Sequence, residues 1–257
     1  MRVAVLKKSF LFKLSAIFLC CLFVASVAVY FRYDALAVFA SGRKVPVYSV
    51  DTDKRVVSLT FDAAWGADKT KGILDILDSY GIKATFFLVG FWVDNFPDMV
   101  KEIDARGHEI GTHSETHPHM PKLTAEKMTE ELKTSSQKIT AITGKSVEIF
   151  RPPFGDYNNT LIEVCEAQNI IPIQWDVDSL DWKGYSAAVI NKRVTDKVKN
   201  GSIVLFHNNS DNILEALPLV IETLKLKGFS FEPVGNVIYK QNYTVDNNGV
   251  QHKNDVQ

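Results

Sequence analysis

Two histidines four residues apart carry the strongest chemical signal in this sequence. His113 and His117 belong to the stretch 111–117 (GTHSETH), which follows a short apolar segment ending at Ile110. Side chains at this spacing on a helical turn share one face, so both imidazoles could reach one ion. Two solvated or hydrogen-bonded histidines are the alternative interpretation. The choice between them depends on what the rest of the chain places nearby.

Other apolar segments also end in polar groups that can do chemistry. These groups are Asp62, Arg151, Asp178, Asp181 and His207. In a barrel-type α/β fold the carboxyl ends of the strands meet around one mouth, so groups that are scattered in sequence converge there. A single polar residue at a strand end is usually just solvated. Together with the histidine pair, five strand ends carry an unusual group, which favours a functional site.

The elements that must position these groups alternate between strand-like and helix-like patterns. The expected strands are 56–61, 84–89, 108–112, 147–151, 170–175, 202–207 and 231–234. The expected helices are 69–80, 97–105, 124–143, 160–168, 187–198 and 214–227, with Thr124 as an N-cap. This alternation indicates βα units and a parallel sheet. Because no GxGxxG loop is present, we predict a small distorted (β/α) barrel of about seven units rather than a Rossmann sheet.

The N-terminus predicts a membrane anchor. Residues 14–31 are apolar and uncharged, and basic residues precede them. The run is long enough to cross a bilayer, and the basic flank should stay in the cytoplasm, which places the body outside at the cell membrane. A cleaved signal peptide ending at the small residue Ala40 is the alternative, and the protein would then be secreted. We divide the chain into residues 1–31 (basic flank and anchor), 32–54 (linker), 55–240 (folded domain) and 241–257 (polar tail, expected to be disordered).

Composition narrows the class of partner. The formal net charge is −1 and the body has no basic run, which argues against nucleic acid. Of three cysteines, two lie in the apolar run and Cys165 stands alone in the body. No disulfide is expected, and Cys165 fits a buried small hydrophobe.

Taken together and in this order, the strand-end motifs resemble the polysaccharide deacetylase family, also known as the NodB homology domain or carbohydrate esterase family 4. The resemblance extends over residues 56–234. The first motif has the form Phe61-Asp62-x-x-Trp65-Gly66, which, with the anchor, is similar to the sporulation-associated branch that acts near spore peptidoglycan.

The resemblance implies metal-assisted hydrolysis of an N-acetyl group on a cell-wall glycan, with peptidoglycan as the expected partner. His113 and His117 would hold a divalent metal, expected to be zinc, which acidifies a bound water. Asp62 would be the general base and His207 the general acid.

The same resemblance assigns supporting roles. Arg151 would keep Asp62 ionised and oriented, and the backbone N–H of Phe154 would bind the oxyanion. Asp178 or Asp181 would orient Arg151 or His207, and the sequence does not decide which. Trp182 and Leu205 would form the apolar pocket for the acetyl methyl, with an ordinary place in the core as their alternative.

One position departs from the family pattern. The family's first motif has a second aspartate as the third metal ligand, and this chain has Ala63 there. Glu115, His119 or Asp68 could substitute for it. The departure leaves two further readings open. One is a catalytically impaired relative that binds glycan or a wall-assembly partner, and the other is an enzyme acting on a small amide.

Overall fold

The computed structural model describes residue 22 and residues 42–254. The expected anchor at 14–31 therefore lies outside the described residues except for Leu22. Residues 32–41 of the expected linker also lie outside them. Contact clustering divides the chain into residues 1–43 and residues 44–257. Within the described residues, no helix is both long enough and apolar enough to cross a bilayer.

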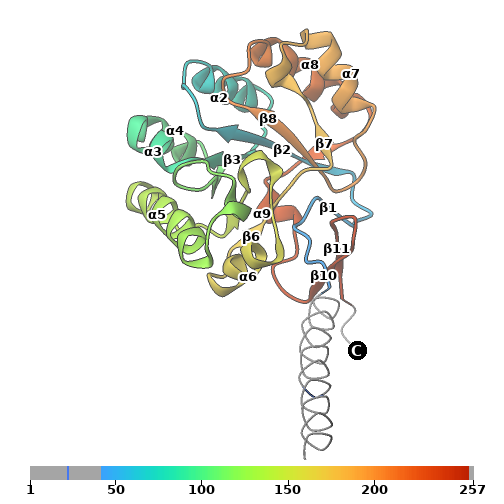
Figure 1. The fold of residues 1–257 in the computed structure, drawn as a ribbon. Helices are drawn as coiled ribbons and strands as arrows, with labels where there is room; N and C mark the ends of the chain where they lie inside the picture. Colours follow the sequence, from blue (N-terminus) through green and yellow to red (C-terminus); the bar gives the residue numbers. More distant parts are fainter. Residues whose placement is uncertain (1–21, 23–41, 255–257) are drawn as a thin grey trace, which may run out of the picture. The chain divides into compact units, whose positions relative to one another are not determined.

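The folded domain is built on a sheet whose central strands are parallel. β2 (Val56–Ala63) lies between β3 (Thr85–Leu88) and β8 (Ser202–His207), and β3 is followed outward by β4 (Glu109–Thr112), β5 (Ile149–Phe150) and β6 (Ile171–Pro172). β7 (Val177–Asp178) pairs with β8, and β9 (Ser230–Phe231) pairs with the start of β2. Figure 1 shows β2 and β8 side by side at the centre with helices outside them. The βα alternation expected from the sequence is present.

The sheet is a distorted half-barrel whose outer strands are short, and a single bridge rather than a continuous ladder connects its β6 side to the start of the domain. β1 (Ser49–Val50) runs antiparallel to β8. Just before it, Val47 forms an isolated parallel bridge to Ile173, which follows β6. The Val47 N–H donates to the Pro172 carbonyl at 3.0 Å, and the Gln174 N–H donates to the Val47 carbonyl at 2.7 Å. The sheet is therefore not closed into a barrel by a continuous series of βα units.

The helices cover the outside of the sheet. They are α2 (Thr70–Ser79), α3 (Gly90–Asn95), α4 (Pro97–Ala105), α5 (Ala125–Thr143), α6 (Asn159–Ala167), α7 (Ala187–Thr195), α8 (Ile213–Leu226) and the single turn α9 (Val234–Val237). Short 3₁₀ turns lie at η1 (Met120–Lys122), η2 (Pro153–Gly155) and η3 (Asp181–Lys183). Thr124 caps α5 as expected, accepting from the Lys127 N–H. Of the strand expected at 231–234, only Phe231 lies in a strand, β9, and the expectation is wrong for the other three residues, where Pro233 is followed by α9.

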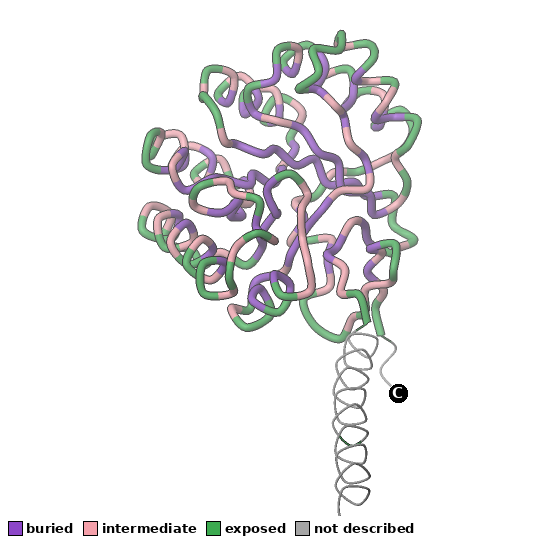
Figure 2. The backbone as a smooth tube through the Cα atoms, viewed as in Figure 1, coloured by how far each residue is buried: buried purple, intermediate pink, exposed green. Residues whose placement is uncertain are grey.

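Strand β2 separates the apolar core from the mouth of the half-barrel. Leu59 and Phe61 point into the main core, where the Phe61 ring stacks on Phe86 at 5.0 Å and on Phe206 at 5.6 Å. Thr60 and Asp62 alternate with them and point to the other face, as strand geometry requires. Figure 2 shows the central strands buried and the outer helices exposed on their outer sides.

Strands form within residues 243–253, which corrects the expectation of disorder for this part of the 241–257 tail. β10 (Tyr243–Val245) and β11 (Val250–Lys253) form an antiparallel hairpin, and β11 pairs in parallel with β1. The Asp246 carboxylate accepts the N–H groups of Asn248 and Val250 at 2.8 and 2.9 Å, which shapes the turn. Aspartate and asparagine form turns of this kind through their own side chains. The polar tail is thus part of the sheet.

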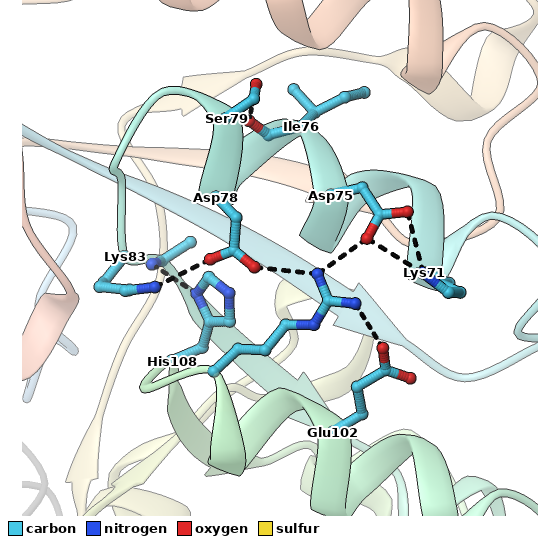
Figure 3. A network of polar contacts seen from close by, with 10 residues as sticks. Lys71, Asp75, Ile76, Asp78, Ser79, Lys83, Glu102 and His108 are labelled. Atoms are coloured by element: carbon cyan, nitrogen blue, oxygen red, sulfur yellow. Dashed lines mark hydrogen bonds and ion pairs between the residues drawn. The ribbon is translucent and has the colours of Figure 1, made fainter.

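An ionic network joins α2 to α4 on the outside of the domain. Arg106, just after α4, donates to Asp75 and Asp78 of α2 at 2.8 and 2.9 Å and also pairs with Glu102 (Figure 3). His108 lies beside this network, and its Nδ1 accepts the Ala84 N–H at 3.2 Å. Burial is the main cause that lowers the pKa of His108 to about 4. His108 is therefore neutral at physiological pH.

Candidate active site

Asp62 stands at the centre of the mouth, near the end of β2. It is the register partner of His207 on β8, so the two side chains start from neighbouring strands at the same level. The Asp62 carboxylate is buried, and its Oδ1 accepts from Arg151 Nη1 at 2.8 Å. Burial alone would raise the pKa of Asp62, but the charges of Arg151, His113 and His207 outweigh it and lower the pKa. Asp62 is therefore ionised.

Arg151 follows β5 and is fully buried beneath the site. Besides Asp62, its Nη1 donates to Thr60 Oγ1 at 2.8 Å, and its Nη2 donates to the Gln174 carbonyl at 3.0 Å. The guanidinium lies 4.2 Å from the centre of the Phe87 ring, which supports it from below. These contacts fix the orientation of the arginine, and the arginine in turn fixes Asp62.

The two histidines lie together, although no helical turn carries them. Ser114 and His117 both have left-handed backbone, with φ of 70° and 57°, and the Ser114 hydroxyl accepts the His117 N–H at 3.0 Å. The expected helical turn is thus replaced by a tight loop. The imidazole centres of His113 and His117 are 4.9 Å apart. His113 Nδ1 lies 2.7 Å from the Arg151 carbonyl, which leaves its Nε2 facing Asp62 Oδ2 at 3.5 Å.

Helix α5 holds the histidine loop in place. One carboxylate oxygen of Glu131 accepts the backbone N–H groups of Glu115 and Thr116, both at 2.8 Å. The other accepts the Thr116 hydroxyl at 2.6 Å. A side chain that ties down two consecutive N–H groups restricts the loop strongly. Sequence reasoning missed Glu131 because it lies in the middle of an ordinary amphipathic helix.

The residues at the mouth do not complete a metal site. Ala63 is fully buried in the apolar core on the helix side of β2. The three proposed substitutes are also unsuitable: Glu115 is paired with Lys138, His119 with Asp156 at 2.5 Å, and Asp68 is exposed in a turn. In the part of the chain that the structure describes, no three His, Cys, Asp or Glu side chains are grouped to hold a metal. Two imidazoles fall short of the three protein ligands usual in a catalytic zinc site.

The structure gives different contacts to the two candidate aspartates, Asp178 at the end of β7 and Asp181 in η3. Asp181 is buried, and its Oδ2 accepts the His207 N–H while its Oδ1 faces His207 Nδ1, both at 2.8 Å. Asp178 instead accepts the Leu180 N–H at 2.8 Å and contacts neither His207 nor Arg151 directly. Burial lowers the pKa of His207, but the hydrogen bond and charge of Asp181, with smaller contributions from Asp62 and Asp178, raise it overall.

The three remaining predicted residues differ in exposure. Leu205 is buried within β8, whereas the Trp182 side chain is 60% exposed in η3, so Trp182 is not core. Phe154 has left-handed backbone with φ of 61°, and its ring lies flat on His119, 4.2 Å between centres. Its other neighbour is His117, whose ring centre lies 4.6 Å away. Left-handed backbone at several non-glycine loop residues is typical of functional sites.

Known proteins match this chain over most of the folded domain. Residues 49–171 match the family described as Polysaccharide deacetylase. A peptidoglycan-N-acetylglucosamine deacetylase of Bacillus cereus is 34% identical over 188 residues, which cover 72% of this chain and 68% of that protein. The chain belongs to the polysaccharide deacetylase family. An uncharacterised relative, YlxY of Bacillus subtilis, is 35% identical over 189 residues, and the matched region covers 74% of this chain and 59% of YlxY.

Solved structures of polysaccharide deacetylase relatives share the fold. One is a pseudoenzyme of carbohydrate esterase family 4 from Bacillus anthracis, with a TM-score of 0.73 and 30% identity over 82% of this chain and 73% of that one. A mutant of that pseudoenzyme with restored enzymatic activity has the same TM-score and 35% identity over 75% of this chain and 71% of that one. Members of the family typically use a divalent metal. The half-barrel seen here is thus the NodB-like fold of this family.

Proposed function

We propose that this protein hydrolyses the N-acetyl group of an N-acetylated cell-wall glycan, with peptidoglycan as the substrate. The observation that carries the proposal is the pairing of Asp62 with His207 across β2 and β8. Their surroundings shift the two pKa values in opposite directions, lowering that of the carboxyl and raising that of the imidazole. An ionised base beside a protonated acid is the arrangement that hydrolysis of an amide needs, whereas binding alone requires neither.

The residues at the mouth divide the reaction between them. Asp62 takes a proton from a water molecule while the oxygen of that water attacks the acetyl carbon. The Phe154 N–H stabilises the oxyanion. His207 gives its proton to the departing nitrogen as the C–N bond breaks, which leaves acetate and a free amine. Arg151 keeps Asp62 in place and Asp181 keeps His207 in place. No step is assigned to a metal ion, because the ligand set is incomplete.

A second candidate function is glycan binding without turnover, and Ala63 favours it. An alanine in the apolar core removes a ligand position, and a pseudoenzyme is among the structural relatives. The protein would then hold N-acetylated glycan at the same mouth or support wall assembly.

Acetate release from purified peptidoglycan by the full-length protein separates the two functions. We would measure it with added zinc, with a chelator and with neither, comparing wild type with Asp62→Asn. Asp98→Asn is the matched control, because Asp98 lies on the surface of α4 and pairs only with Lys101. Hydrolysis predicts acetate from wild type and the control, and a loss of about 10²–10⁴-fold in Asp62→Asn. Binding to peptidoglycan without acetate under any condition would establish the second function.

The setting of this activity is also a proposal. The apolar run at 14–31 supports an anchor in the cell membrane with the body outside the cytoplasm, and the form of the first motif supports a role in sporulation. If the anchor is retained, the full-length protein fractionates with membranes, and protease added to intact protoplasts digests the body. A mature protein that begins after Ala40 would contradict the anchor and indicate secretion.

A further inference from the structure

An exposed tryptophan lies beside the histidine loop without a role in the chemistry described above. Trp65 follows β2 by two residues, and 60% of its surface is exposed. The centre of its ring is 6.3 Å from that of His117. Tryptophan has a large apolar surface, so a water-exposed tryptophan side chain next to a reactive site is a candidate contact for a ligand.

The Trp65 ring is held in position although its face is open. It packs against the ring of Phe91, from α3, with 5.0 Å between centres. The next residue, Gly66, has left-handed backbone with φ of 60°, which glycine adopts without strain. The Gly66 carbonyl accepts from Trp92 Nε1 at 2.7 Å and from Asn208 Nδ2 at 2.9 Å. The tryptophan therefore needs little further ordering to bind a ligand, which lowers the entropy cost of binding.

A second exposed ring also neighbours His117. Phe154 is 58% exposed, and its ring stacks on that of His119, which pairs with Asp156. The His117 ring thus has both Trp65 and Phe154 beside it, with 6.3 and 4.6 Å between ring centres. Exposed aromatic rings beside polar imidazoles suit a ligand with alternating apolar and polar surface. The C–H faces and hydroxyl edges of pyranose rings have that character.

We propose that Trp65 forms a sugar-stacking subsite for the pyranose ring next to the reacting unit of an N-acetylated glycan chain. The inference rests on the proposed function and makes it more specific. It predicts that the substrate is a chain of sugars, because Trp65 lies beside His117 whereas Asp62 faces His113, so that the ring next to the reacting unit is the one that Trp65 would contact. A protein partner fits less well, because stable protein interfaces need a larger continuous surface than two isolated rings.

Binding of defined oligosaccharides to the full-length protein tests the subsite. The probes are the β-1,4-linked tetramer of N-acetylglucosamine and the monomer, with Kd measured by calorimetry. The variants are Trp65→Ala, Trp65→Phe and the surface control Leu226→Ala, since Leu226 is 90% exposed at the end of α8. We expect Trp65→Ala to weaken tetramer binding roughly three- to tenfold, with Trp65→Phe closer to wild type. Monomer affinity should not change in any variant.

The outcomes separate failure of the subsite from failure of the proposed function. Equal tetramer affinity in wild type and Trp65→Ala would overturn the subsite and leave the proposed function standing. Equal losses in Trp65→Ala and Leu226→Ala, or a parallel loss of monomer binding, would also overturn it. If wild type binds no oligomer and releases no acetate from peptidoglycan, the proposed function and the subsite both fail. Thermal melting of each variant shows whether the fold is intact.

Discussion

Asp181 holds His207 at two points, accepting its backbone N–H and facing its ring Nδ1, both at 2.8 Å. A carboxylate that contacts both the main chain and the ring fixes the orientation of the imidazole and favours its protonated form. The consequence is that the pKa of His207 is raised, so His207 keeps its proton to a higher pH than a free histidine does.

Replacing Asp181 by asparagine should lower the pKa of His207. His207 acts in its protonated form, so activity is lost as the pH rises through its pKa. In Asp181→Asn the fall in acetate release should therefore begin at a lower pH than in wild type. Titration of the His207 ring signals by NMR measures the same shift without activity. Asp178→Asn is the matched control, because Asp178 acts on His207 only through its charge and should cause a smaller shift. The same pKa of His207 in wild type and in Asp181→Asn would contradict this account.

Replacing Arg151 by leucine should destabilise the fold by about 3–5 kcal/mol at pH 7, because it removes the cation that pairs with the buried Asp62 carboxylate at 2.8 Å. Burial then raises the pKa of Asp62, so the loss should shrink as the pH falls and Asp62 takes up a proton. Urea unfolding at pH 7 and pH 4 measures both effects. The double variant Asp62→Asn/Arg151→Leu should recover part of the stability at pH 7. A loss that is the same at both pH values would argue against an uncompensated charge.

Replacing His108 by glutamine should reduce the loss of stability in acid. The folded pKa of His108 is about 4, below its unfolded value of 6.5. Between these values the unfolded chain binds the proton and the folded protein does not, so wild-type stability falls as the pH drops from 6.5 to 4. His108 should account for about 2 kcal/mol of this fall, allowing for partial solvent screening. Urea unfolding of wild type and His108→Gln at pH 7 and pH 4.5 measures how much of the stability each protein loses in acid. His252→Gln is the control, because Asp51 raises the pKa of that histidine and its removal should not reduce the acid loss.

Replacing Ala63 by aspartate should make stability depend on zinc. Ala63 is fully buried on the apolar face of β2, so without metal the new carboxylate should lower the melting temperature. Ala63 is the last residue of β2, so in the presence of zinc the strand end should rotate and bring the carboxylate out of the core to His113 and His117. The carboxylate then adds a third protein ligand, and the melting temperature should rise more than that of wild type. Melting curves with zinc and with a chelator measure this. Identical curves under the two conditions would show that the carboxylate stays among its apolar neighbours.

The convergence of the site was predictable because it follows from topology. Asp62, Arg151 and His207 each lie at or just after the carboxyl end of a parallel strand, and these ends meet at one edge whatever their separation in sequence. What the sequence could not decide was the local geometry. Asp178 and Asp181 are of the same type and three residues apart. Only the left-handed backbone at Leu180 and the turn after it direct the second aspartate to His207.

The errors in the fold prediction arise where pairing is distant or local signals are weak. The two-residue strand β1 and the hairpin of β10 and β11 show no apolar alternation, because they are short and because polar Ser49 and Gln251 occupy buried positions in them. Helix α3 was missed because it begins at Gly90 and follows a strand after one residue. The helical turn expected at 113–117 fails because Ser114 and His117 take left-handed backbone. In each case a tertiary contact overrides the local pattern.

The pairing of β1 with β11 also bears on how the chain is made. β1, the first strand of the domain, pairs with β11, so that Ser49 lies opposite Val250 across almost the whole folded domain. During synthesis β1 therefore lacks this partner until β11 has left the ribosome. Long-range parallel pairing of this kind is slow, because a large loop must close before the contacts form. The central strands can assemble earlier from neighbours closer in sequence, so the hairpin should be the last part of the sheet to dock. A nascent chain stalled before residue 243 would leave that edge of the sheet open.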